Sequence, residues 1–228
     1  LEFRRVLFRS AKTPGNAQMP YLNKEVQTPE PVDCRILTAA LDLFVERGFH
    51  NVSVHDVQKN ANVSIGSIYN HFGGKEGIAK ALYYHLLKEF EEMIENIVAE
   101  DMSNRERCNK IIALLFEYTE SRRNIISYML HAKHREFLPG EPPICSATPF
   151  KAMRNIVQQG IEEGEIRQGN PWVVAASVFG GAIRMIHLRL DGVIKEPLTQ
   201  HYDEVVDCMW QGMNQVTLPE SGKRRAMR

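Results

Sequence analysis

The chain has 228 residues, 43% of them hydrophobic and 25% charged, and its formal net charge at pH 7 is zero. This composition is typical of a globular protein with a sizeable core. A neutral chain has no overall field that attracts nucleic acid or membrane, so any anion-binding surface must be local. The four cysteines form no Cys-x-x-Cys pair. This spacing argues against a zinc site and favours reduced thiols in a cytoplasmic protein, with a redox-sensing cysteine as the alternative.

The first residues are predicted to stay outside the fold. Residues 1–31 are rich in Pro, Asn, Gln and Thr without periodicity, which predicts a disordered leader. The opening LEFRRVLFRS has no initiating methionine, and we interpret it as a cloning artefact, with Met19 as a native start. The alternative is a basic arm that contacts DNA through Arg4, Arg5 and Arg9.

Three helices are predicted next in the chain. The first runs from Val32 to Gly48, because apolar residues between these positions recur with i, i+3, i+4 spacing and glycine ends helices readily. Ser53 begins a short helix that ends near residue 60, because Asp56 three positions later completes a capping box. Asn62 suits a left-handed turn. Ser64 caps the third helix, which extends through Phe72 and is ended by Gly73-Gly74.

The remainder of the chain is predicted to be helical as well. A long helix runs from about Lys75 to Glu100, and an irregular segment covers Leu138 to Thr148. The basic tail, residues 219–228, is predicted to be disordered. Further helices are expected near residues 104–120, 122–136, 147–164, 170–190 and 198–217. No segment shows sustained strand alternation, so the fold class is all-α, with a DNA-binding unit at 32–76 and a larger C-terminal helical domain at 77–218. The most apolar run, Pro171 to Ile183, is shorter than the about 20 residues of a membrane span, and we expect no membrane segment.

The second and third helices together describe a helix-turn-helix, whose second helix enters the major groove of DNA. Gly66 leaves room for close approach, and the helix N-terminus at Ser64 offers free N–H groups to a phosphate. Ile65 can pack on a thymine methyl, and Asn70 can pair with the N6/N7 edge of adenine. The other candidates are donors suited to phosphate oxygens. The predicted DNA-binding residues are Ser53, Ser64, Ile65, Gly66, Ser67, Tyr69, Asn70, His71 and Lys75.

The stretch VSIGSIYNHFGGKEGI, preceded by RILTAALDLFVERGFHNVSVHDV, resembles the N-terminal DNA-binding domain of the TetR/AcrR family of bacterial repressors. Two residues depart from the family pattern: Gln58 stands in place of alanine, and Asn62 in place of glycine. The segment Ser64–Phe72 also carries no Lys or Arg, so the commonest guanine contact is missing and a G-rich operator is disfavoured. The rest of the chain resembles the family only in general architecture, including the phrase GIEEGEIR at residues 160–167.

This resemblance implies a ligand-responsive repressor without enzymatic activity or cofactor. It would bind double-stranded, palindromic operator DNA as a homodimer and be released by a small-molecule effector. The last two helices would form a four-helix dimer interface, with monomer core as the alternative for two apolar helices at a chain end. The interface residues would be Ala176, Gly180, Val205, Met209, Trp210 and Met213. The middle helices would enclose the effector with Phe90, Met93, Phe116, Tyr118, Tyr128, Met129 and Met153. Because these side chains carry no charge, we expect an apolar or aromatic effector.

Several other readings of the residues remain open beside this one. Each aromatic or methionine residue of the effector set could be plain core, and His131 and His134, at i and i+3, could ligate a metal, although a solvated or core pair is favoured. The GGKE segment lacks the flanking residues of a phosphate loop. A helical enzyme with a His or Cys nucleophile is disfavoured, because no Gly-x-Ser-x-Gly elbow is present. An effector-independent architectural or division-related DNA-binding protein is the main alternative function.

Overall fold

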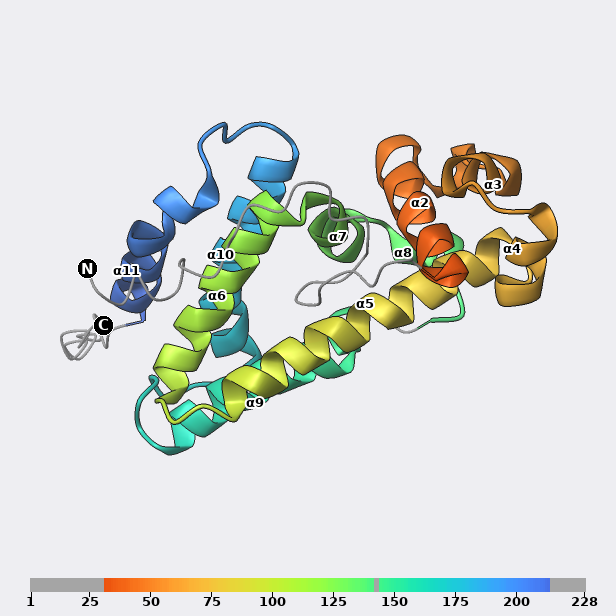
Figure 1. The fold of residues 1–228 in the computed structure, drawn as a ribbon. Coiled ribbons are helices and arrows are strands. Elements are labelled where there is room, and N and C mark those ends of the chain that lie inside the picture. Colours follow the sequence, from red (N-terminus) through yellow and green to blue (C-terminus); the bar gives the residue numbers. More distant parts are fainter. Residues whose placement is uncertain (1–30, 142–143, 214–228) are drawn as a thin grey trace, which may run out of the picture.

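The structure is a computed structural model that describes residues 31–141 and 144–213. Within these residues the backbone forms helices and no strands, which confirms the all-α prediction. The predicted leader and tail lie outside the described residues, apart from Pro31. Figure 1 shows α2, α3 and α4 grouped at one end of the molecule, and α6, α10 and α11 at the other. The long helix α5 begins beside α4 and runs between the two ends, with α9 alongside it.

The first group is a three-helix unit with a short 3-10 turn between its first two helices. Its elements are α2 (Val32–Arg47), η1 (Phe49–Asn51), α3 (Val54–Ala61) and α4 (Ile65–Phe72). Ser53 and Asp56 form the predicted capping box at the start of α3. Asn62 has the left-handed conformation (φ 50°, ψ 54°) that the tight turn requires. Ser64 caps α4 by accepting a hydrogen bond from the Ser67 N–H at 3.0 Å.

The C-terminal domain is built on five longer helices that share one apolar core. They are α5 (Lys75–Val98), α6 (Asn104–Ser121), α9 (Thr148–Glu162), α10 (Pro171–Leu190) and α11 (Tyr202–Gly212). The turn after α9 closes the far end of this core. The Glu165 carboxylate accepts the backbone N–H groups of Asn104 (2.6 Å) and Arg105 (3.2 Å), so it caps α6 from a distant segment. A β-carbon at Gly160 would lie 2.7 Å from Ile166, so glycine permits this close packing.

The prediction of a single helix near residues 122–136 is wrong. The chain forms α7 (Arg123–Ile126), a π-turn η2 (Ser127–His131) and α8 (His134–Phe137) in its place. The Ala132 N–H reaches five residues back to the Ser127 carbonyl at 3.0 Å, as a π-turn requires. Residues 125–126 and 128–129 are buried in this segment. The regular helix α2 buries the same spacing at residues 36–37 and 39–40, so hydrophobic periodicity alone does not reveal the break.

The last predicted helix also begins differently. Residues Leu198–Gln200 form a 3-10 turn, η4, before α11 begins. The Leu198 N–H donates to the Glu120 carboxylate at 3.0 Å, and Arg189 forms a two-pronged ion pair with the same carboxylate at 2.7 and 2.9 Å. This cluster fixes the chain where it leaves α10, and α11 starts only after it. A further short 3-10 turn, η3, covers Ile144–Ser146.

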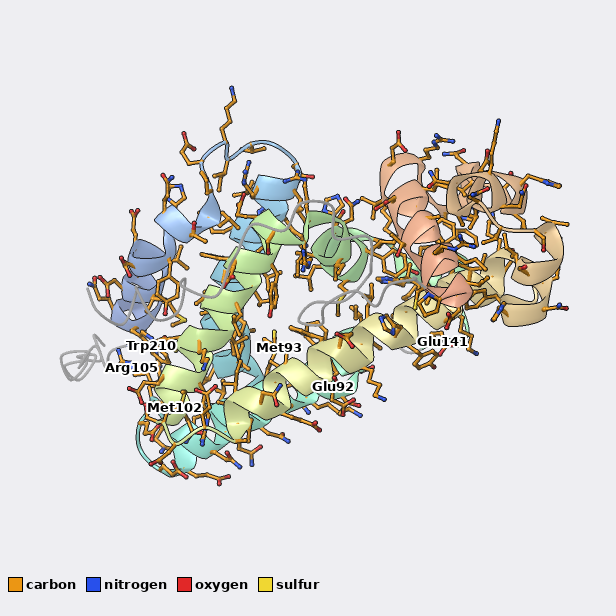
Figure 2. All side chains as sticks on the ribbon, in the orientation of Figure 1. Glu92, Met93, Met102, Arg105, Glu141 and Trp210 are labelled. Atoms are coloured by element: carbon orange, nitrogen blue, oxygen red, sulfur yellow. The ribbon has the colours of Figure 1, made fainter. Side chains whose placement is uncertain are left out.

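The two domains contact each other directly. The Asn124 amide of α7 donates to the Asp42 carboxylate of α2 at 2.6 Å. The Tyr128 hydroxyl donates to the carbonyl of Ala79, in the first turns of α5, at 3.1 Å. Glu141, which Figure 2 shows close to α5, forms an ion pair with Lys80 of that helix at 2.8 Å. The Asn124–Asp42 hydrogen bond therefore joins the two domains directly, whereas the contacts of Tyr128 and Glu141 hold the first turns of α5, which continues from the DNA-binding unit, within the C-terminal domain.

Candidate DNA-binding and effector sites

The outer face of α4 gathers most of the predicted DNA-binding residues. Ile68 is fully buried and attaches the inner face of the helix to the core. On the other side, Ile65 is 37% and Tyr69 is 55% exposed. The remaining exposed residues on this helix are Gly66, Asn70 and His71. A short helix that presents small, amide, imidazole and phenol groups can place hydrogen-bonding groups at base edges and phosphates.

The three predicted serines lie at the first turns of α3 and α4. Ser64 is exposed at the α4 N-terminus, and its hydroxyl lies 2.8 Å from the hydroxyl of half-buried Ser67. Ser53 is exposed at the start of α3, where its N–H donates to the Asp56 carboxylate at 2.8 Å. Hydrogen bonds from the Ser53 hydroxyl and N–H lower the pKa of Asp56. These serines fix the first turns of both helices and leave the helix N-termini open toward solvent.

Lys75 has intramolecular partners that the sequence does not reveal. Its ammonium donates to the Phe49 carbonyl at 3.0 Å and lies 4.3 Å from the centroid of the Phe49 ring. The side chain is half-buried and ties the first turn of α5 to η1. In the structure, therefore, the charge of Lys75 faces Phe49.

Two further residues position the recognition helix. A β-carbon at Gly77 would lie 1.7 Å from the carbonyl oxygen of Phe72, so only glycine lets α5 approach the end of α4 this closely. The sequence reasoning missed Gly77, although a glycine inside a predicted helix is a signal for close packing. Gln58 donates through its side-chain amide to the Val63 carbonyl at 2.8 Å. This hydrogen bond supports the turn between α3 and α4 and accounts for the first departure from the family pattern.

The predicted effector residues all lie in the interior of the C-terminal domain. Phe90, Met93, Phe116, Tyr118, Tyr128, Met129 and Met153 are each at most 7% exposed and belong to one core. They come from α5, α6, η2 and α9, and the Phe90 ring packs on Phe150 with centroids 5.6 Å apart. Met93 of α5 is labelled in Figure 2. Tyr128 also lines a cavity of about 260 Å³ between the two domains.

The structure separates the two histidines that were considered as metal ligands. His131 is exposed, and its Nε2 lies 3.5 Å from the Asp191 carboxylate. His134 is buried among the rings of Tyr83, Tyr128 and Phe137, and this burial lowers its pKa to about 4. Among the described residues no three His, Cys, Asp or Glu side chains are grouped to hold a metal ion. The histidines therefore serve different local structures.

The predicted dimer residues fall into two groups. Ala176 and Gly180 are exposed on α10, where Trp172 and Val173 are 63% and 64% exposed. This helix is also long and apolar enough to cross a membrane by length and composition. Val205 and Met209 are half-buried on α11. The sequence does not reveal that the other two predicted dimer residues, Trp210 and Met213, point inward.

Trp210 and Met213 are the inward-facing pair, each less than 9% exposed. The Trp210 ring N–H donates to the Asn109 side-chain carbonyl at 2.7 Å, and the Arg105 guanidinium lies 4.3 Å from the ring centroid. Figure 2 shows Arg105 at the start of α6 beside Trp210. Trp210 thus attaches α11 to α6, whereas α10 exposes the large apolar residues Trp172 and Val173.

Comparison with known proteins gives matches over both domains. Residues 36–82 match the family described as "Bacterial regulatory proteins, tetR family", and residues 83–215 match "Tetracyclin repressor-like, C-terminal domain". The fatty acid metabolism regulator protein of Bacillus subtilis (strain 168) is 26% identical over 163 residues, which cover 67% of this chain and 80% of that protein. The regulator UidR of Escherichia coli (strain K12) is 32% identical over 104 residues, 44% of this chain and 51% of UidR.

Solved structures of similar fold include two FadR regulators. FadR from Bacillus subtilis, in complex with stearoyl-CoA, superposes with a TM-score of 0.67 at 23% identity and covers 78% of this chain and 97% of that one. FadR from Bacillus halodurans gives a TM-score of 0.71 at 19% identity and covers 83% of this chain and 100% of that one. At these identities the likeness establishes a shared fold.

Proposed function

Because the chain belongs to the TetR family of bacterial regulatory proteins, we propose that it binds a palindromic operator as a homodimer and releases it when a small-molecule effector with a large apolar part binds. The observation that carries this proposal is the outer face of α4. Its exposed side chains are grouped on one side of a capped helix, while Ile68 anchors the other side. This is the arrangement by which a recognition helix enters the major groove.

The chemistry of that face favours an A·T-rich half-site. Asn70 is exposed and is the amide on α4 that can pair with both N6 and N7 of adenine. Ile65 supplies an apolar side chain for a thymine methyl. Since no Lys or Arg lies between Ser64 and Phe72, guanine has no bidentate cation to read it. Tyr69 and His71 are left to contact the phosphates on either side.

Dimerisation through α10 and α11 supplies the second half of the site. The exposed apolar face of α10 combines small residues, Ala176 and Gly180, with the larger Trp172 and Val173. Small residues let a second helix approach closely, and burial of such a contiguous apolar face stabilises an assembly. Two copies related by a two-fold axis would then present two recognition helices to the two half-sites of a palindrome.

The effector site is proposed in the core between α5, α6 and α9. Its side chains are apolar or aromatic, which favours an effector with a large apolar part. FadR of Bacillus subtilis has been solved with stearoyl-CoA, so a long-chain acyl-CoA is the first compound to test here. An effector that binds the released conformation more tightly by about 1–3 kcal/mol would weaken operator binding about 5- to 150-fold.

Binding to duplex DNA from upstream of the protein's own gene tests the proposal. We expect footprinting to protect a palindrome and Asn70→Ala to weaken binding to it by about 1–3 kcal/mol, with relaxed preference at one base pair. Asn96→Ala makes the same chemical change on an exposed face near the far end of α5 and should leave the affinity unchanged. Equal losses in both variants, or no loss in Asn70→Ala, would show that α4 does not read the bases.

A further inference from the structure

A cavity of about 260 Å³ lies where the DNA-binding unit meets the C-terminal domain. The end of α2 and the turn η1 form one side of it, and the π-turn η2 with α8 forms the other. We propose that this junction cavity binds a small, neutral, planar aromatic molecule. Tyr128 is the one predicted effector residue that also lines this cavity, whose other lining residues lie outside that set. The proposal does not depend on operator binding.

The walls of the junction cavity are suited to an aromatic ring. Phe44 and Phe49 line it from the DNA-binding unit, and Tyr128 and Phe137 line it from the C-terminal domain. Phe49 and Phe137 already stack across the domain boundary, with centroids 4.7 Å apart and planes inclined by 17°. Phe44 lies at 5.3 Å from Phe49 in a tilted arrangement. A planar guest would extend this cluster with the offset or edge contacts that aromatic groups prefer.

The volume limits the size of the ligand. An engineered apolar cavity of about 150 Å³ is enough to hold benzene. The junction cavity, at about 260 Å³, has room for two fused rings. Pockets that take drug-sized ligands begin near about 300 Å³, so an acyl-CoA is too large for this site. The occupant is therefore of a different class from the effector proposed above.

The π-turn gives the cavity a polar group with a free hydrogen-bonding capacity. Ser127, the first residue of the turn, lines the cavity, and its hydroxyl makes no hydrogen bond to another described residue. A π-turn is a rare interruption of a helix and is frequent at functional sites. Here it turns Ser127, Tyr128 and His131 toward the same cavity. A ligand with one hydroxyl or ring N–H can use the serine as donor or acceptor.

The charges at the rim favour a neutral ligand. The Lys133 ammonium lies 3.3 Å from the Glu136 carboxylate, so the two formal charges at this edge offset each other. His131 lies beside Asp191. An anion would have to compete with these carboxylates for the same cations, whereas a neutral aromatic molecule meets no such competition. The ligand would also touch Phe49, whose carbonyl and ring hold Lys75 at the start of α5.

Titration of the full-length protein with 2-naphthol tests the site. This probe has two fused rings and one hydroxyl, and its binding can be followed by NMR. We expect saturable binding with intermolecular NOEs to the rings of Phe49 and Phe137. Ala132→Phe should fill the cavity and weaken binding at least tenfold, because Ala132 lines it with an extended backbone that accepts any side chain. Ser127→Ala should weaken binding about 2- to 10-fold through the loss of one hydrogen bond.

Arg135→Phe is the matched control, because it adds the same ring to an exposed position of α8 that does not line the cavity. This variant should bind 2-naphthol as the wild type does. The proposal is overturned if the wild type shows no saturable binding, or if the NOEs come from the core between α5, α6 and α9. If Ala132→Phe fails to fold, the NOEs of the wild type and the affinity of Ser127→Ala decide the question.

Discussion

His134 is expected to make the stability of the protein sensitive to mild acid. The side chain is 8% exposed, and its Nε2 is buried without a hydrogen-bond partner among the described residues. Desolvation lowers its pKa from 6.5 to about 4, although a hydrogen bond with the Tyr128 backbone opposes the shift. Tyr83 and Tyr128 pack on it, and burial raises the pKa of Tyr128 above its usual value.

The sign and size of the effect follow from these values. The folded protein keeps His134 neutral, whereas the unfolded chain binds a proton as the pH falls below 6.5. The free energy of unfolding is therefore fully retained above pH 6.5 and falls as the pH decreases toward 4. Between pH 7.5 and pH 5 the loss from this one group amounts to about 2 kcal/mol, and it levels off near about 3 kcal/mol below pH 4.

Urea unfolding at pH 7.5 and pH 5.0, followed by circular dichroism, measures this loss in the wild type and in His134→Phe. Phenylalanine fits the aromatic surroundings and cannot be protonated. Carboxylates such as Asp56 and Glu106, whose pKa values are lowered by their capping serines, titrate in both proteins and cancel in the comparison. We expect the wild type to lose about 2 kcal/mol more than the variant. Equal losses would refute the assignment of a neutral, buried imidazole.

Three other substitutions test the geometry of the DNA-binding unit and the dimer. Gly77→Ala places a β-carbon 1.7 Å from the Phe72 carbonyl oxygen, so we expect a lower melting temperature, a loss of about 2 kcal/mol or more, and weaker operator binding. Gly66→Ala meets only the Ser64 hydroxyl at 3.8 Å and should stabilise α4 by up to about 1 kcal/mol, yet the methyl should reduce operator affinity in a fluorescence titration. Ala176→Glu should yield monomers in a sedimentation experiment. The control Val193→Glu changes an exposed apolar residue outside α10 and should leave the dimer intact. If the Ala176→Glu protein is a dimer, the interface lies elsewhere.

Local hydrogen-bonding signals made the DNA-binding unit predictable from sequence. Ser53, Asp56, Asn62 and Ser64 act within four residues of their own position, and each has the conformation or partner that its residue type predicts. The apolar stripes also identified the core, because burial follows helical periodicity. The all-α class required no more than the absence of strand alternation. These features depend on neighbours in the sequence.

The features that the sequence did not reveal depend on distant neighbours. Lys75 looks like a solvent-facing cation, but the Phe49 carbonyl, 26 residues earlier, accepts its hydrogen bond. Trp210 fits an outward apolar stripe, but Asn109 and Arg105 hold it against α6. The π-turn has no signature in the apolar pattern, because residues 125–129 share their apolar spacing with the regular helix α2, whereas Tyr128 of the turn contacts the carbonyl of Ala79, 49 residues earlier. Tertiary contacts decide each of these cases.

The central claim is that α4 reads a specific palindrome in the context of a dimer. Its most direct test is an equilibrium titration of the wild-type protein, at one fixed salt concentration, with the footprinted palindrome and with the same duplex after one half-site is scrambled. The account predicts that scrambling one half-site weakens binding by about 30-fold or more, since one half-site carries about half of the free energy that separates specific from non-specific binding, a ratio of about 10³ or more. Equal affinity for the two duplexes would contradict it.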